Sequence, residues 1–100
     1  MRVKFSKAFE KASKRLPNKV FTNLQKALQE VKQAQSIDDI SNCIKMVGFQ
    51  YAYRIRVGSH RAFFIFHVEI IDDVVRFEYL IPRGQAYDKK NMDNLRGKDI

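Results

Sequence analysis

The chain has 100 residues, a length that suffices for one folded domain but not for two. Hydrophobic residues make up 45% of it and aromatic residues 12%. Those proportions exclude an intrinsically disordered chain, and no apolar run approaches the about 20 residues that a membrane-spanning helix needs. The net charge of +8 favours a polyanionic partner such as nucleic acid, an acidic protein or anionic lipid, although solubility alone would also explain it.

Two features bear on where the chain acts. The N-terminus lacks the apolar segment of a secretory signal, so we expect no export. Cys43 is the single cysteine, which cannot build a disulfide framework or a zinc site and fits a reducing cytoplasm. We expect Cys43 to be a small buried hydrophobic residue rather than a nucleophile.

The N-terminal third holds most of the excess positive charge, because residues 1–32 contain nine basic and two acidic side chains. Met1–Phe5 alternates and predicts a short strand, and Ser6 is a suitable N-cap for a helix behind it. Apolar residues then recur at helical spacing, first up to Pro17 and again over about Asn18–Gln35. This predicts a helical hairpin whose outward lysines either form a solvated face or contact RNA.

After Gly48 the hydrophobic period changes from 3.6 to 2. Strands are predicted over Tyr51–Val57, Arg61–Ile70 and Val74–Ile81, and the short turns between them predict an antiparallel meander. The apolar positions expected to face the helical hairpin are Ala62, Phe64, Phe66 and Val68 on the middle strand, and Val75, Phe77, Tyr79 and Ile81 on the last. The predicted fold class is α+β, with an N-terminal helical hairpin packed on a small antiparallel sheet in the order β-α-α-β-β-β.

The C-terminal segment is polar. Pro82 removes a backbone donor and ends the last strand. Asp88–Ile100 has little to bury, so we expect a loose tail or a short frayed helix there. The predicted organisation is a single domain over residues 1–88 and a polar C-terminal tail over residues 89–100.

Three arginines are predicted to share one face of the sheet. Arg54 and Arg56 alternate with apolar residues, and Arg61 opens the next strand across a short turn. Close cations repel one another, so stability does not explain their placement, whereas a bound polyanion does. The alternative is that each arginine lies over an apolar face or pairs with Glu69 or Glu78.

Three further residues are candidates for chemistry. Arg83 follows the last strand, at the edge of the sheet, and Tyr87 stands four residues later in a polar stretch. Spacing alone favours a packing role for Tyr87. His60 lies beside Arg61 and is either an acid or base or merely solvated. His67 and Glu69 are expected to be structural.

Three segments are similar to one family of small proteins. The sequence of residues 53–64, Tyr-Arg-Ile-Arg-Val-Gly-Ser-His-Arg-Ala-Phe-Phe, is similar to the central hairpin of the RelE/ParE superfamily of bacterial toxins. Residues 81–87, Ile-Pro-Arg-Gly-Gln-Ala-Tyr, resemble its closing segment, with Pro82 where the family has His or Lys. Residues 45–48 resemble its Lys-x-Leu-x-Gly lead-in. The resemblance covers roughly residues 1–88.

The resemblance implies the toxin of a toxin–antitoxin pair. RelE-type members cleave mRNA, usually in the ribosomal A site, whereas ParE-type members inhibit DNA gyrase and often lack the closing tyrosine. Tyr87 favours RelE. A ParE-like gyrase inhibitor without catalysis, or a plain nucleic-acid-binding module, remains an alternative.

The resemblance also implies a set of site residues and partners. Matched to the family, Arg54, Arg56 and Arg61 occupy the positions of residues that hold RNA phosphates, and Arg83 and Tyr87 those of the catalytic pair. We therefore expect a catalytic set of Arg61, Arg83 and Tyr87, and an RNA-binding set of Lys45, Arg54, Arg56 and His60. Expected partners are an acidic antitoxin, in a hetero-oligomer, and mRNA with the ribosome. We expect no metal, no cofactor and no membrane.

The chemistry that this set would perform needs no metal ion. RNA is cut when its own 2′-hydroxyl attacks the adjacent phosphorus, which leaves a cyclic phosphate. The transition state needs charge stabilisation, which arginines supply, and proton transfer at two oxygens, to which Tyr87 is suited.

Overall fold

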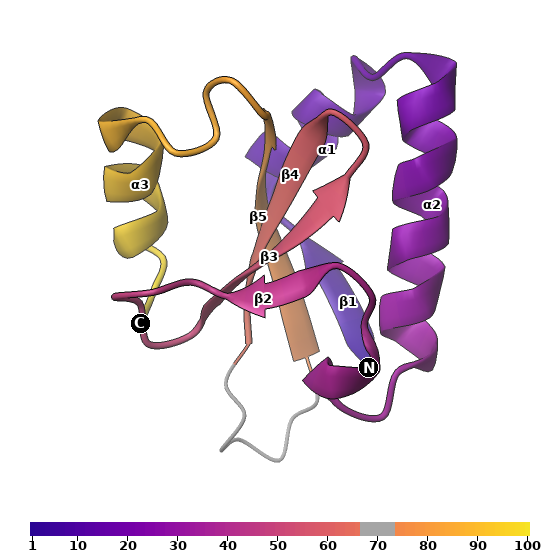
Figure 1. Cartoon of the computed structure of the whole chain (residues 1–100), viewed down its shortest axis with the longest axis horizontal. Helices are drawn as coiled ribbons and strands as arrows, with labels where there is room; N and C mark the ends of the chain where they lie inside the picture. The colour runs from indigo at the N-terminus through magenta and orange to yellow at the C-terminus, as the bar shows by residue number, and fades with distance from the viewer. Residues whose placement is uncertain (67–73) are drawn as a thin grey trace.

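The computed structural model describes residues 1–66 and 74–100, and Figure 1 shows helices packed on both sides of one sheet. The strands are β1 (Arg2–Phe5), β2 (Cys43–Lys45), β3 (Ala52–Val57), β4 (His60–Ile65) and β5 (Val74–Pro82). The helices are α1 (Lys7–Lys14), α2 (Asn18–Gln33) and α3 (Lys89–Arg96), with a short 3₁₀ turn at Ile37–Asp39. The predicted α+β class is confirmed. The predicted middle strand is described up to Phe66; its residues 67–70, which include His67, Val68 and Glu69, lie outside the described residues.

The sheet has the strand order β1-β5-β4-β3-β2. β2 to β5 form the predicted antiparallel meander, with β2 as an additional short strand. β1 pairs with β5 in parallel, from Arg2 opposite Val74 to Phe5 opposite Phe77, so the sheet is mixed rather than wholly antiparallel. Hydrophobic period does not encode strand direction, and three residues in β2 are too few to display a period.

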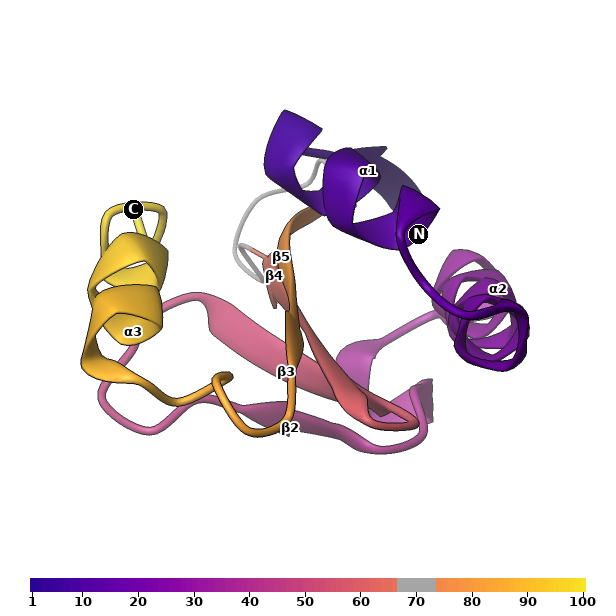
Figure 2. The ribbon, with the colours of Figure 1, turned by 90° about the horizontal axis from the view of Figure 1, so that it is seen from above.

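The helical hairpin forms where the sequence predicts it. The Ser6 hydroxyl accepts from the Phe9 amide at 3.0 Å, which starts α1, and donates to the Glu78 carbonyl at 2.6 Å, which ties that start to β5. Pro17 precedes α2, where its fixed φ suits the helix entry. Figure 2 shows α1 and α2 together on one side of the sheet and α3 on the other.

The main hydrophobic core lies between the sheet and the helical hairpin. Phe9 of α1 and Leu24 and Val31 of α2 are fully buried against it. The sheet contributes Tyr53, Ile55, Val57, Ala62, Phe64, Val75, Phe77 and Leu80 to this core, and Phe66, which follows β4, also belongs to it. The expectation for Ala62, Phe64 and Phe66 is confirmed.

The expectation that Tyr79 and Ile81 also face the helical hairpin is wrong. The register between β4 and β5 shifts at Phe63/Phe64, where Phe63 pairs with Tyr79 and Phe64 with Phe77. Glu78 is thus an extra residue in β5, and an extra residue reverses the alternation of the strand beyond it. Tyr79 and Ile81 therefore pack on the opposite face of the sheet.

A second, smaller core on that opposite face includes α3. Leu95 of α3 is fully buried there, together with residues such as Phe49, Phe63 and Ala86. The Asp99 carboxylate accepts from the Gln50 and Tyr51 amides at 2.7 and 2.6 Å. The C-terminal segment thus forms the short helix that was one of its two expected states. The expectation that it buries little is wrong, because Leu95 and Met92 pack into this core, Arg96 lies over the Phe49 ring, and the Asp99 carboxylate holds the end of the chain.

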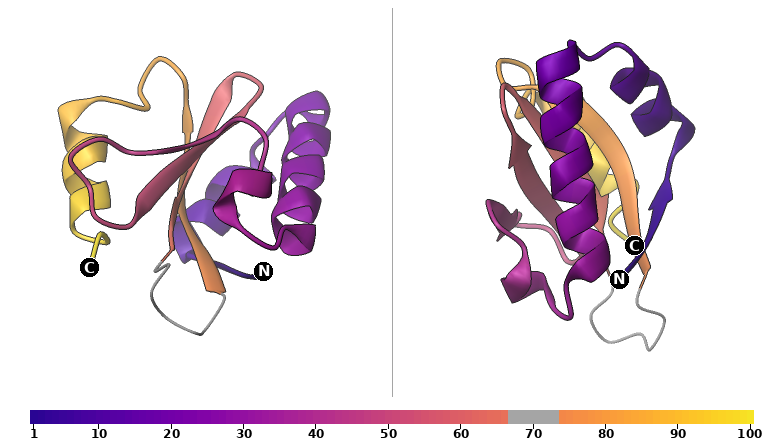
Figure 3. Two further views of the ribbon diagram at one scale, coloured as in Figure 1. Left: turned by 60° about the horizontal axis from the view of Figure 1, so that its bottom comes forward. Right: turned by 90° about the vertical axis from the view of Figure 1, so that its right-hand side faces the viewer.

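The two cores place the helical hairpin and α3 on opposite sides of the sheet (Figure 3). No helix in the described part of the chain is both long and apolar enough to cross a membrane.

Candidate functional site

The three arginines of the central hairpin share one face of the sheet, as predicted. Arg56 pairs directly with Arg61 across β3 and β4, and Arg54 pairs with Phe63. Directly opposed residues in an antiparallel pair project to the same side. We call this cluster of Arg54, Arg56 and Arg61 the arginine face, and it lies on the side of the sheet away from the helical hairpin.

The arginine face is less open than the sequence suggests. Arg56 is exposed, Arg54 is half-buried, and Arg61 is only 6% exposed, because it lies in the central strand β4 between Arg56 and Ile81. The Arg61 Nη1 donates to the carbonyls of Gly58 and His60 at 3.3 and 3.0 Å. These bonds fix the side chain against the hairpin turn.

No carboxylate within the described residues neutralises the arginine face. Over residues 1–66 and 74–100, neither Arg54 nor Arg61 forms an ion pair, and the Nε of each is buried without a hydrogen-bond partner. Glu78 therefore does not pair with them, and Glu69 lies outside the described residues. Buried donors left unsatisfied are costly and rare in folded proteins. The face retains positive charge that an anion can neutralise.

Tyr87 lies on the arginine face although it is far from the arginines in the sequence. Its hydroxyl oxygen accepts a hydrogen bond from the Arg54 Nη1 at 2.9 Å. Its ring meets Phe63 edge-to-face at 6.1 Å between centroids, and the side chain is 49% exposed. Tyr87 is thus no buried anchor. Because the oxygen accepts from Arg54, its own O–H remains available to a bound substrate.

Arg83 begins the loop that carries Tyr87. Its backbone amide donates to the Ser59 carbonyl at 2.8 Å, which joins the end of β5 to the β3–β4 turn. Pro82 takes the last strand position, opposite His60, where its missing N–H ends the ladder. Ala86 is fully buried in the second core and holds the other end of the loop. The Arg83 side chain is exposed at the sheet edge.

Lys45 and His60 do not join the arginine face. Lys45 pairs with Tyr53 and His60 with Val57, and both partners belong to the core under the helical hairpin. The Lys45 Nζ donates to the Phe49 carbonyl at 2.8 Å. Burial lowers the pKa of His60 below its usual range, so its ring is neutral at pH 7, and its Nδ1 lies 3.2 Å from the Ser59 hydroxyl.

Two other residues near the site show what the sequence missed and what it anticipated. Phe63 contacts Tyr87, and its position two residues after Arg61 was the available signal that it shares the arginine face. Cys43 is half-buried, and burial raises the pKa of its thiol to about 11, which favours the protonated form. Within the described residues, no three His, Cys, Asp or Glu side chains are grouped as metal ligands would be.

Comparison with known proteins decides the family. The chain is 30% identical over 89 residues to Toxin RelE3 of Methanocaldococcus jannaschii, an alignment that spans 88% of this chain and 97% of that protein. The chain belongs to the RelE toxin family. The predicted resemblance is thereby confirmed, although no protein-family model matches the chain.

Solved RelE structures share the fold. The crystal structure of a RelB–RelE antitoxin–toxin complex from Methanococcus jannaschii matches with a TM-score of 0.70 and 25% identity, over 85% of this chain and 95% of that one. The structure of an E. coli RelE mutant in the free state matches with a TM-score of 0.73 and 21% identity, over 99% of this chain and 97% of that one. The RelE fold thus includes the helical hairpin, the mixed sheet and α3.

Proposed function

We propose that this RelE-family chain is the toxin of a toxin–antitoxin pair and acts as an endoribonuclease on mRNA, on the ribosome and in the cytoplasm. The observation that carries the proposal is the hydrogen bond from Arg54 to Tyr87, which joins a proton-bearing group to a cluster of cations that no carboxylate of the described residues neutralises. A gyrase inhibitor would need the cations but not the phenol.

In the proposed reaction, the 2′-hydroxyl of one nucleotide attacks the adjacent phosphorus. The new 2′-oxygen–phosphorus bond forms as the bond to the 5′-oxygen breaks, which leaves a 2′,3′-cyclic phosphate and a free 5′-hydroxyl. Arg61 and Arg83 stabilise the charge that builds on the phosphate oxygens. Tyr87 gives its proton to the departing 5′-oxygen, and the proton of the 2′-hydroxyl passes to solvent or a second base.

The proposed RNA-binding residues fall into two groups. Arg54 and Arg56 lie on the arginine face, where guanidinium groups can take phosphates in bidentate fashion. The strand register directs Lys45 and His60 to the other face of the sheet. They would therefore contact RNA only where the RNA strand passes around the edge or the end of the sheet. We propose that Arg54 and Arg56 make the larger contribution.

The partner is proposed from charge and from the relatives. The RelE chains of M. jannaschii and Pyrococcus horikoshii, to which this chain is 25% and 26% identical, were each solved in complex with RelB. We propose that this chain likewise binds an acidic antitoxin, and its net charge of +8 suits such a partner.

The experiment that tests the function is controlled expression of the chain in cells. We expect growth arrest, new mRNA 5′ ends that map within codons, and unchanged DNA supercoiling. Purified chain should then be assayed on ribosome-bound and on free mRNA to separate the two substrates. Altered supercoiling without new RNA ends would establish the gyrase alternative. A harmless chain that binds RNA without cutting it would establish the binding-module alternative.

The contribution of Arg54 to RNA binding can be measured separately from catalysis. Arg54→Ala removes one phosphate contact, so RNA affinity should fall and the slope of log affinity against log salt should shrink by about 1. Filter binding or fluorescence anisotropy over a salt series measures both. Lys90→Ala, which removes an exposed cation on α3, is the matched control and should leave the slope unchanged. An unchanged slope in Arg54→Ala would remove this residue from the RNA path.

A further inference from the structure

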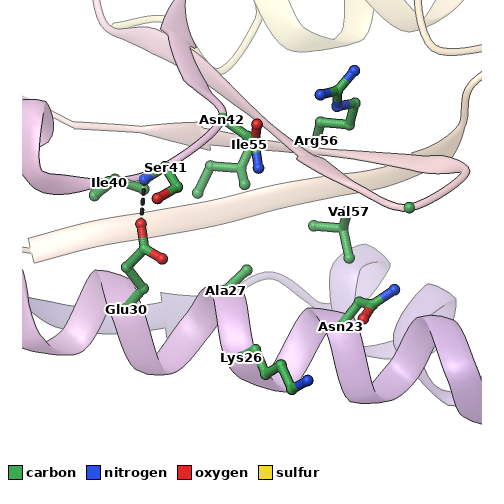
Figure 4. Close-up of a pocket in the computed structure, with 11 residues that line it drawn as sticks. Asn23, Lys26, Ala27, Glu30, Ile40, Ser41, Asn42, Ile55, Arg56 and Val57 are labelled. Atoms are coloured by element: carbon green, nitrogen blue, oxygen red, sulfur yellow. Dashed lines mark hydrogen bonds between the residues drawn. The ribbon is translucent and has the colours of Figure 1, made fainter.

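At the edge strand β2, the arginine face has a hollow of about 280 Å³. It is lined on the β2 side by Asn42, Cys43 and Ile44, and on the β3 side by Arg54 and Arg56. Ile44 lies directly opposite Arg54, and directly opposed residues of an antiparallel pair project to the same side. Figure 4, a view of the groove between α2 and β3 on the other face, shows Arg56 directed away from α2 and Val57 directed toward it. The hollow therefore opens on the arginine face.

The hollow adjoins the proposed active site through Arg54. The Arg54 Nη1 donates to the Tyr87 hydroxyl oxygen at 2.9 Å, and the same residue forms a wall of the hollow. Neighbouring strands lie about 5 Å apart, so the hollow begins one strand away from the contact between Arg54 and Tyr87. A nucleotide whose phosphate is held at that contact has its base within reach of the hollow.

The lining of the hollow combines an apolar surface with two cations. Ile44 is 50% exposed and offers its aliphatic side chain beside Arg54. The N–H donors of a guanidinium lie in its plane, so an arginine can hold a phosphate at its edge while its flat face stacks on a base. The hollow thus matches both halves of a nucleotide, the phosphate and the base.

Asn42 adds an uncharged group that can recognise the edge of a base. Its backbone carbonyl accepts from the Arg56 amide at 3.2 Å, which holds it beside β3. The residue is exposed, and its side-chain amide makes no hydrogen bond within residues 1–66 and 74–100. A side-chain amide presents one acceptor and one donor group, the combination with which asparagine pairs with N6 and N7 of adenine. Guanine presents two acceptors at the same edge.

We propose that this hollow is a subsite for one base next to the scissile phosphate, and that it prefers adenine. Ile44 and Arg56 lie against the faces of the base, and Asn42 pairs with its edge. The proposal deepens the proposed function and rests on it, since it takes RNA to be the substrate. It assigns base selection to Asn42 and Ile44, which take no part in the proposed reaction.

The test is a titration of the ¹⁵N-labelled full chain with two small probes. One is adenosine 3′,5′-bisphosphate, and the other is the same sugar bisphosphate without the base. The adenosine probe should shift the amide signals of Cys43, Ile44 and Arg54 and bind about tenfold more tightly than the baseless probe, the usual effect of one stacked base. Equal affinity of the two probes would overturn the proposal.

A matched pair of variants assigns the effect of the base to the hollow. Ile44→Thr keeps the β-branched shape that strands favour but reduces the apolar surface, so it should lose most of the tenfold advantage. Val47→Thr makes the same kind of change at a residue that is 96% exposed and does not line the hollow, and it should keep the advantage. An advantage that survives Ile44→Thr contradicts the assignment.

The role of Asn42 is tested by Asn42→Gly. The φ of 58° lies in the left-handed region, which glycine adopts freely, so the variant loses the amide without straining the backbone. The wild-type chain should bind the adenosine probe about fivefold more tightly than its guanosine counterpart, and the variant should bind both alike. An unchanged ratio would exclude Asn42 from base selection.

Two further measurements separate this proposal from its alternatives. A glutamate-rich peptide that shifts the same amide signals more strongly than the adenosine probe at equal concentration would identify the hollow as a protein contact and overturn the base subsite. A chain that binds the adenosine probe in the hollow but never cuts RNA keeps the subsite and refutes the nuclease. A chain that cuts RNA while neither probe distinguishes the hollow refutes the subsite alone.

Discussion

Tyr87→Phe is expected to lower the rate of RNA cleavage by roughly 10²–10⁴-fold, the usual contribution of a positioned proton donor. The substitution keeps the ring and its edge-to-face contact with Phe63 and removes only the hydroxyl that Arg54 contacts. RNA affinity should change little, because the phosphate-binding cations remain. Single-turnover cleavage of a defined mRNA, with enzyme in excess, measures the chemical step directly.

The control for this prediction is thermal unfolding together with a second tyrosine. Tyr87 is 49% exposed, so loss of one hydrogen bond should cost at most about 1 kcal/mol of stability. Tyr53→Phe also removes a hydroxyl, but from the core under the helical hairpin, and should cleave at the wild-type rate. A wild-type rate in Tyr87→Phe would exclude Tyr87 from catalysis. A large loss of stability that matches the loss of rate would indicate a packing role instead.

Arg83→Ala should reduce the cleavage rate by roughly 10²–10³-fold through loss of a charge that stabilises the transition state. The position is well suited to this role. The Arg83 amide is fixed to Ser59 at 2.8 Å, while its side chain is exposed and makes no hydrogen bond or ion pair within the described residues. The side chain is therefore held at its base and free at its tip. The same single-turnover assay applies.

Two neighbouring variants control for effects on the loop. Gln85→Ala removes another exposed side chain from the same loop, and its backbone bond to the Pro82 carbonyl is retained, so its rate should match the wild type. Arg83→Lys keeps the charge but loses the planar fork, and an intermediate rate is expected. If Arg83→Ala and Gln85→Ala were equally active, Arg83 would have no part in the reaction.

Local residue choices were enough to predict much of the fold. Ser6 and Pro17 bound the two helices of the helical hairpin because capping and fixed φ act within one turn of the chain. The strands β3, β4 and β5 follow from a period of 2 and short turns. Arg54, Arg56 and Arg61 were assigned to one face by the same alternation, since a tight hairpin brings direct neighbours into register.

Other features depend on contacts between distant residues and could not be predicted in this way. The extra residue at Glu78 reverses one end of β5, and only its register against β4 reveals it. The parallel pairing of β1 with β5 likewise depends on which strands become neighbours in the folded sheet, because these two strands are far apart in the sequence. In the C-terminal segment, Met92 and Leu95 are too few apolar residues to give a clear helical period. Leu95 is nevertheless fully buried, because α3 lies against a sheet face already lined with apolar side chains.

Some features of the candidate site could likewise be predicted from the sequence, and others could not. The sequence by itself determined the basic hairpin, the family resemblance and the spacing from Arg83 to Tyr87, all of which lie within short continuous segments. Only the tertiary structure decided that Tyr87 meets Arg54, that Arg61 is buried with no carboxylate from residues 1–66 or 74–100 beside it, and that Lys45 and His60 project from the other face. The physical reason is that side-chain direction in a sheet is set by register and by the loop that follows it, and both are fixed by packing between segments far apart in the chain.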